Sequence, residues 1–160
     1  MKRNNLRPAI SLMALLLFTC CAAFAQTRPD SNLTEVKKAI AASNATYFEG
    51  FAKNDPALFT SHYTSDCWIM PPNAASLCGP DAAPGFFKAA YNLGVRNGRL
   101  ITIDVHGISN DVVAEVGFFR LVNAENKEFD DGKYLVLWKK TKDGWKMFRD
   151  SFSSDHTTKN

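Results

Sequence analysis

The 160-residue sequence lacks the motifs that would assign an activity by themselves. It has no glycine-rich phosphate-binding loop, no nucleophile elbow and no cysteine–histidine pair. Its histidines, at positions 62, 106 and 156, do not have the spacing of metal ligands. Internal repeats and low-complexity runs are absent as well. The sequence therefore predicts no metal and no cofactor, and it leaves open whether the protein is an enzyme.

Continuous hydrophobic sequence is also scarce. The main apolar run begins at Ile10, after a basic start, and is followed by the small-x-small pattern Ala23-Phe24-Ala25. A membrane-spanning helix needs about 20 apolar residues, so this shorter run favours a secretory signal peptide. We predict a signal over residues 1–25 and a single mature domain over residues 26–160.

Two alternatives to a cleaved signal remain open. One is a permanent N-terminal anchor, which the short apolar run disfavours. The other is lipidation at Cys20 or Cys21, where the preceding residue is Thr19 or Cys20 instead of the usual small residue. The expected location is therefore secreted or periplasmic, with lipoprotein attachment as the less favoured route.

Excess charge is missing from the mature chain. Three of the 19 basic side chains and none of the 16 acidic ones fall within residues 1–25, which leaves 16 of each. A neutral domain has no electrostatic footprint for nucleic acid or an anionic membrane. We therefore expect no nucleic-acid partner and, after signal removal, no membrane partner.

Only two cysteines, Cys67 and Cys78, lie in the mature chain. An oxidising compartment would permit a disulfide between them, worth about 3 kcal/mol if unstrained. The alternative is a pair of free thiols that act as small hydrophobic groups. Spacing alone does not decide between the two, because it does not place the Cβ atoms.

Helices are expected in the first half of the mature chain. Asn32 and Glu35 have the spacing of a capping box, and an apolar stripe with steps of three and four continues to Phe51. Asp55 followed by Pro56 predicts the start of a second, short helix. A third helix is expected over residues 81–93.

Strands are expected around and after these helices. A short one covers residues 67–70, and four more cover 100–108, 112–122, 133–141 and 145–153. The first of these four alternates Ile101, Ile103 and Val105 with polar residues, and Asp143-Gly144 is a strong hairpin turn signal. This order predicts an α+β fold with helices on one face of a bent antiparallel sheet.

Several segments are similar to the SnoaL-like and ketosteroid-isomerase-like families of the nuclear transport factor 2-like superfamily. They are FAKND (51–55), YTSDCWIMPP (63–72), GKYLVLWKK (132–140) and DGWKMFRDSF (143–152). The resemblance implies a cone-shaped bent sheet wrapped around the N-terminal helices, with a mostly apolar cavity at the open end. Homodimers are common in this superfamily, so the resemblance also implies a homodimer here. The fold alone does not determine the function.

The resemblance can be carried to individual positions. Tyr47 matches the inward tyrosine that ketosteroid isomerases use as an oxyanion donor. Their general base falls on Met70 or Pro71, which cannot accept a proton, and their second oxyanion donor falls near Lys133 or Tyr134. Steroid isomerisation is therefore not expected here.

The first candidate for chemistry is Asp150, which lies between Phe148 and Phe152 in the last strand. A carboxyl group in an apolar cavity has its charged form disfavoured and its pKa raised toward acid–base work. The alternative is a surface ion pair with Arg149 or Lys140, or a contact with a helix end.

Tyr47 is the second candidate, with a core tyrosine as its alternative. The candidate catalytic residues are thus Asp150 and Tyr47. The candidate ligand-binding residues are Tyr47, Trp68, Met70, Trp138, Asp150 and Phe152, several of which would equally suit a plain hydrophobic core. His106 is expected at a solvated edge, and Glu115 is expected at the surface, although its strand would also allow it to point inward.

Two functions follow from this pattern. The first is binding of a small, largely apolar molecule in an internal pocket, with or without weak isomerase- or cyclase-type acid–base chemistry. The second is a non-catalytic association module that works as a homodimer or with another partner. The lysines of the last two strands weigh mildly against a large dry interface on that side of the sheet.

Overall fold

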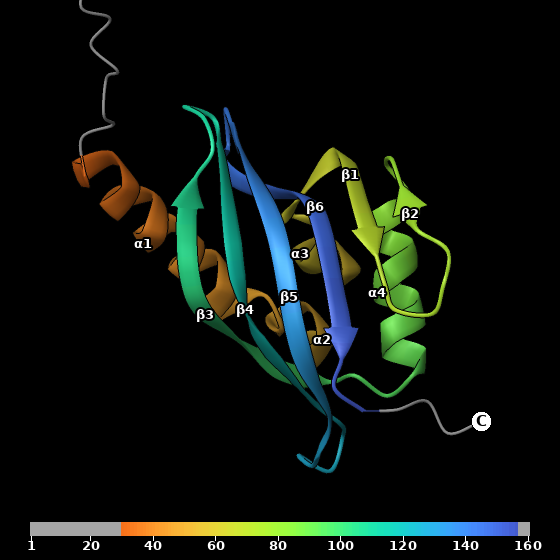
Figure 1. The fold of residues 1–160 in the computed structure, drawn as a ribbon. Coiled ribbons are helices and arrows are strands. Elements are labelled where there is room, and N and C mark those ends of the chain that lie inside the picture. Colours follow the sequence, from red (N-terminus) through yellow and green to blue (C-terminus); the bar gives the residue numbers. More distant parts are fainter. Residues whose placement is uncertain (1–29, 157–160) are drawn as a thin grey trace, which may run out of the picture.

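The structure, a computed structural model, describes residues 30–156, and side chains from residue 33 onward. The predicted signal peptide lies outside the described residues. The elements are α1 (Asp30–Thr46), α2 (Glu49–Lys53), α3 (Pro56–Thr60), β1 (Tyr63–Met70), β2 (Leu77–Cys78), α4 (Ala82–Asn92), β3 (Asn97–Gly107), β4 (Val112–Val122), β5 (Glu128–Thr141) and β6 (Gly144–Ser154) (Figure 1).

These strands form one bent, unclosed sheet in the order β2-β1-β6-β5-β4-β3. β1 and β6 pair in parallel, and every other neighbouring pair is antiparallel. Helices α1, α2 and α3 lie behind the sheet, while α4 lies beside β1 and β2 (Figure 1). The predicted α+β plan, with helices packed on one face of a bent sheet, is confirmed.

Two local predictions from the sequence are confirmed in detail. Asp55 caps α3 by accepting hydrogen bonds from the backbone amides of Ala57 (2.9 Å) and Leu58 (3.1 Å), and Pro56 is the first helical residue. The hairpin between β5 and β6 pairs Thr141 with Gly144, which has a φ of +99°. Glycine adopts this left-handed conformation without the steric cost that a Cβ atom would add.

The first helix differs from the expectation of one continuous helix through Phe51. The chain leaves α1 after Thr46 and begins α2 at Glu49. Tyr47 and Phe48, at the turn, are both buried. Adjacent side chains on a straight helix point about 100° apart, so a turn at this point helps both rings to face the sheet.

Two β-bulges change which residues face inward. In β3 a register shift between Thr102 and Asp104 leaves Ile103 without a directly opposite partner, and Ile103 is 60% exposed whereas Val105 is buried. The predicted alternation of Ile101, Ile103 and Val105 on one buried face is therefore wrong. It assumed an unbroken period of two, which a bulge interrupts.

A second bulge lies in β6, where Trp138 pairs with Met147 but Leu137 pairs with Arg149. The extra residue is Phe148, which contacts Arg149 and Lys139 through its ring. Phe148 therefore does not share the face of Asp150 and Phe152, contrary to the expectation from simple alternation. The bulge allows Met147 and Asp150, three residues apart, to point into the same interior.

The core lies between the inner face of the sheet and the helices. It is rich in aromatic side chains, with Phe51 stacked on Phe87 and Phe59 packed edge-on against Phe51. Each buried aromatic ring of this size removes a large apolar area from water. Among the described residues, no helix is both long and apolar enough to cross a membrane.

Candidate functional site

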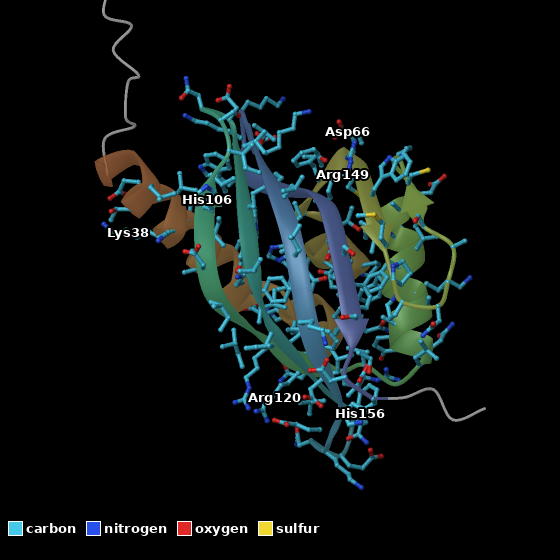
Figure 2. All side chains as sticks on the ribbon, viewed as in Figure 1. Lys38, Asp66, His106, Arg120, Arg149 and His156 are labelled. Atoms are coloured by element: carbon cyan, nitrogen blue, oxygen red, sulfur yellow. The ribbon has the colours of Figure 1, made fainter. Side chains whose placement is uncertain are left out.

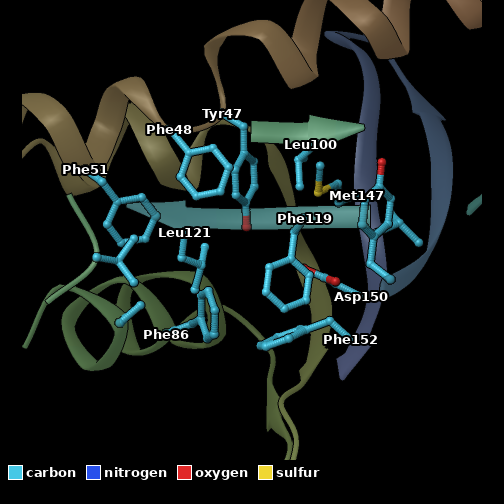
Figure 3. A pocket seen from close by; sticks show the side chains of 14 residues that line it. Tyr47, Phe48, Phe51, Phe86, Leu100, Phe119, Leu121, Met147, Asp150 and Phe152 are labelled. Atoms are coloured by element: carbon cyan, nitrogen blue, oxygen red, sulfur yellow. The ribbon is translucent and has the colours of Figure 1, made fainter. Parts of the chain in front are cut away.

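A partly open cavity lies between the helices and the inner face of the sheet. The centres of water-sized molecules can occupy a volume of about 70 Å³ inside it. Its walls are almost entirely apolar, and its polar side chains are Tyr47, Tyr134 and Asp150. The remaining lining residues are Phe48, Phe51, Phe86, Ala90, Val95, Leu100, Phe119, Leu121, Val136, Met147 and Phe152 (Figure 3).

Three of the candidate residues from the sequence meet at this cavity: Tyr47, Asp150 and Phe152. Trp68, Met70 and Trp138 are not among the residues that line it. Trp68 is 43% exposed because it lies on the outer side of β1, Met70 ends that strand, and Trp138 is enclosed in the core behind the cavity wall.

A chain of three hydrogen-bonding groups lies at one side of the cavity, and its two ends, Tyr47 and Asp150, line it. The Tyr63 hydroxyl donates to Asp150 Oδ2 at 2.7 Å, and the hydroxyls of Tyr47 and Tyr63 are 2.7 Å apart. Tyr47 follows α1, Tyr63 begins β1 and Asp150 lies in β6. Figure 3 shows that Tyr47 and the Asp150 carboxylate extend into the cavity from the helical and the sheet side.

Asp150 is a buried carboxyl group with little compensation for its charge. It is 6% exposed, and Tyr63 is the one side chain among the described residues that donates a hydrogen bond to it. Burial raises its pKa to about 6, the Tyr63 hydrogen bond lowers it, and the charge of Glu115 raises it further. A carboxyl with this pKa changes its protonation state close to neutral pH, which suits a group that exchanges protons or hydrogen bonds with a ligand.

The phenols around Asp150 keep their protons. Burial raises the pKa of Tyr47 and of Tyr63 well above the usual value, and the negative charge of Asp150 adds to both shifts. Burial and the charge of Glu115 likewise raise the pKa of Tyr134. Each of the three hydroxyls therefore keeps its one proton at neutral pH.

Glu115 forms a second polar cluster next to the cavity and is fully buried. Its Oε1 accepts hydrogen bonds from Asn44 Nδ2 (2.7 Å), Thr102 Oγ1 (2.7 Å) and Tyr134 Oη (2.8 Å), and its Oε2 accepts one from Trp138 Nε1 (2.8 Å). Glu115 therefore points inward, whereas the sequence favours the surface.

Gly117 makes room for one arm of this cluster. A Cβ atom at this position would lie 2.5 Å from Tyr134 Cζ and Oη and 2.5 Å from the Ile101 carbonyl oxygen. Real Cβ atoms do not come this close, so only glycine lets the Tyr134 ring cross β4 and reach Glu115.

His62 and Ser43 form a polar contact outside the cavity. Ser43 Oγ lies 2.8 Å from His62 Nδ1, and burial lowers the pKa of the His62 imidazole. The other two histidines are exposed, and Figure 2 shows His106 on β3 far from His156 near the end of the described chain. Among the described residues, no three His, Cys, Asp or Glu side chains are grouped closely enough to hold a metal ion.

Cys67 and Cys78 are free thiols, the alternative to a disulfide. Cys78 lies opposite Trp68 in the pairing of β1 with β2, so it shares the outer face of Trp68 and is exposed. Cys67 precedes Trp68 and therefore points to the opposite, buried side.

Sequence reasoning missed two members of the site. Tyr63 appears in it only within the segment 63–72, and Tyr134 only through its position in the family resemblance. No local sequence signal identifies them, because their partners lie far away in the sequence.

Comparisons with known proteins identify the fold. No protein-family model and no curated protein sequence match this chain. A nuclear transport factor 2-like superfamily protein from Salmonella enterica superimposes with a TM-score of 0.61 at 17% identity, covering 79% of this chain and 96% of that one.

Two other similar structures carry different functional descriptions. A proposed aromatic ring hydroxylase from Novosphingobium aromaticivorans has a TM-score of 0.62 at 13% identity, with 82% of this chain and 94% of that one covered. A proposed calcium/calmodulin-dependent protein kinase II association domain from Xanthomonas campestris has a TM-score of 0.59 at 16% identity, with 72% and 84% covered. The chain therefore has the nuclear transport factor 2-like fold, which does not by itself determine a function.

Proposed function

We propose that this protein, exported by its N-terminal signal to the periplasm or the exterior, binds a small, largely apolar molecule in the cavity beside Tyr47 and Asp150. The observation that carries the proposal is the contrast between the two buried carboxyl groups. Glu115 accepts four hydrogen bonds, whereas Asp150 accepts one and borders the cavity. A purely structural carboxyl would have been satisfied or replaced, because an undercompensated buried charge costs free energy.

Acid–base chemistry on the bound molecule would extend this function. Asp150 is the group that would move a proton, since its pKa of about 6 lies close to neutral pH. Tyr47 is the neighbouring hydroxyl that would contact the same ligand. The fold similarity to a proposed ring hydroxylase is compatible with a reaction but names no substrate.

Filling the cavity should abolish binding. Ala90 lines the cavity from α4, so Ala90→Leu places three extra carbon atoms in a space of about 70 Å³. We expect binding of single-ring compounds (toluene, anisole, phenol and benzaldehyde) to weaken at least about tenfold, because the displaced contacts are those of a buried ring. The measurement is a titration followed by backbone amide chemical shifts in two-dimensional NMR.

The matched control is Ala89→Leu, one residue earlier on the same helix and exposed. It should bind the compounds as the unmodified protein does. If none of the compounds shifts the amides of Val95 or Leu121 in the unmodified protein, or if Ala90→Leu binds normally, the pocket function is wrong.

The second candidate function, homodimeric association, is favoured by the outer face of the sheet. This face exposes Ile101 and Ile103 from β3, Val116 and Phe118 from β4 and Leu135 from β5. Isolated exposed apolar residues are common, but a contiguous group over three strands marks an interaction surface. A second copy of this chain would match the surface, because a two-fold symmetric dimer packs the same apolar residues of both copies against each other.

Phe118→Lys should convert such a dimer into a monomer. The ring lies in the middle strand of the group and is 47% exposed, so the lysine charge would be desolvated without a partner in the contact. Sedimentation velocity at about 50 µM should show the mass halve, while Phe129→Lys, outside this group, leaves it unchanged. A monomeric unmodified protein at that concentration would remove the second candidate.

A further inference from the structure

The polar side chains of the cavity have their protons committed elsewhere. Tyr134 donates its hydroxyl proton to Glu115 Oε1, and Tyr63 donates its own to Asp150 Oδ2. A phenol has a single proton, so Tyr63 acts as acceptor in its 2.7 Å contact with Tyr47. Tyr47 is therefore the donor in that contact, and its oxygen presents only lone pairs to the cavity.

Asp150 adds a second acceptor to the same wall. Among the described residues, no group donates a hydrogen bond to its Oδ1. This unpaired oxygen is also not fully enclosed by other atoms. The oxygen therefore borders free space, and Asp150 lines the cavity. The side chains that complete the lining are apolar, so the cavity has hydrogen-bond acceptors and no side-chain donor.

This distribution defines which polar group a ligand must carry. Building on the binding function proposed above, we propose that the cavity selects small neutral hydroxyl compounds, phenols or alcohols, over molecules of the same shape whose polar group only accepts hydrogen bonds. A hydroxyl proton directed at Asp150 Oδ1 or Tyr47 Oη satisfies a buried acceptor that an ether, an aldehyde or a ketone leaves unpaired.

Charged ligands fit less well. The lining has no cationic side chain, and the carboxylates of Asp150 and Glu115 repel an anion. A cation would gain from Asp150 but would lose its hydration among walls made of phenylalanine, leucine and valine. Stripping water from an ammonium group costs several kcal/mol, far more than from a hydroxyl, so the neutral donor is favoured.

A set of single-ring probes tests this selection at pH 7.5. Phenol and anisole differ only in the methyl group that blocks the donor, and phenol should bind about tenfold more tightly. Benzaldehyde, benzylamine and benzoate supply an acceptor, a cation and an anion on the same ring. Dissociation constants from NMR titration should place phenol first.

The two proposals fail in different ways. If toluene, anisole or benzaldehyde binds as tightly as phenol at amides around the cavity, the selection for hydroxyl compounds is wrong while the binding function stands. Tightest binding by benzylamine or benzoate also overturns the selection. If no probe binds, the binding function fails and the selection fails with it.

Tyr63→Phe should weaken the preference for hydroxyl compounds without altering the cavity lining. Tyr63 is not a lining residue, but its removal leaves the Tyr47 proton free to be donated to a ligand. The ratio of benzaldehyde affinity to phenol affinity should then rise about tenfold. Tyr91→Phe, a half-buried tyrosine outside the cavity, is the matched control and should leave the ratio unchanged.

Thermal unfolding and circular dichroism check that Tyr63→Phe remains folded. Should it not fold, the ratio can be measured in the unmodified protein at pH 5, where protonated Asp150 donates to Tyr63 and the chain reverses toward Tyr47. An unchanged ratio in the folded variant, or at pH 5, contradicts the proposed direction of the hydrogen-bond chain.

Discussion

Replacing Asp150 with asparagine should stabilise the protein at pH 8, by about 2 to 3 kcal/mol. The folded-state pKa of Asp150, about 6, lies above the ordinary value of 3.8. The folded protein therefore binds this proton more tightly than the unfolded chain, and the carboxylate reduces stability above about pH 6. As the pH falls from 7 to 4 the penalty disappears, because the folded protein takes up the proton first.

Urea unfolding at pH 8 and at pH 4 measures this difference. The stability gain of Asp150→Asn should be large at pH 8 and close to zero at pH 4. Asp143→Asn, in an exposed loop, is the matched control. Tyr63 is hydrogen-bonded to Asp150, and Tyr47, Cys67, Glu115 and Tyr134 are the other titratable groups close enough to interact with its charge. An equal gain at both pH values would mean that the effect comes from packing and not from the charge.

The Asp150→Asn substitution should also change ligand preference. The introduced amide would accept the Tyr63 hydrogen bond through its oxygen and direct an N–H into the cavity. A gain in stability combined with loss of phenol binding is the behaviour expected of a residue kept for function at a cost to folding.

Glu115→Gln should destabilise the protein by about 3 kcal/mol, the opposite sign from Asp150→Asn. All four contacts of Glu115 come from groups that donate to its two oxygens. A glutamine retains one acceptor oxygen, and its NH₂ group replaces the other. Keeping the three donors at Oε1 paired requires the NH₂ group to point at Trp138 Nε1. The indole N–H can only donate, so it would be left buried and unpaired.

Urea unfolding of a double-mutant cycle locates this cost. Glu115→Gln and Trp138→Phe should each destabilise the protein, but the double variant should be less destabilised than the two losses added together, since the unpaired indole N–H is gone. Glu125→Gln, on an exposed turn, is the matched control. A loss below about 0.5 kcal/mol for Glu115→Gln would contradict a supporting role for this cluster.

The two carboxyl groups together describe how the cavity is built. They lie in one row across the sheet, because Glu115 pairs with Val136 and Val136 pairs with Asp150. Glu115, which accepts hydrogen bonds at both carboxylate oxygens, orients Tyr134 and links α1 to β3, β4 and β5. The rigid wall formed in this way supports the neighbouring Asp150, which retains an acceptor for a ligand.

Much of the fold could be predicted from local sequence. The Asp55-Pro56 helix start and the Asp143-Gly144 turn depend on groups within a few residues, so their chemistry is visible in the sequence. The strand predicted over residues 112–122 has the same bounds in the structure. The prediction failed where one extra residue, Ile103 or Phe148, shifts the alternation of a strand without a distinctive sequence signal.

The sequence by itself determined the α+β order, the aromatic interior and the candidacy of Asp150, because propensity and hydrophobic periodicity act over short separations. The candidacy of Tyr47 came from the resemblance to ketosteroid isomerases. Only the tertiary structure decided that Tyr63, 16 residues from Tyr47 and 87 from Asp150, joins them in one hydrogen-bonded chain. It also decided that Glu115 is enclosed by four donors. The parallel pairing of β1 with β6 and the bulges set these contacts, and both depend on packing between distant segments.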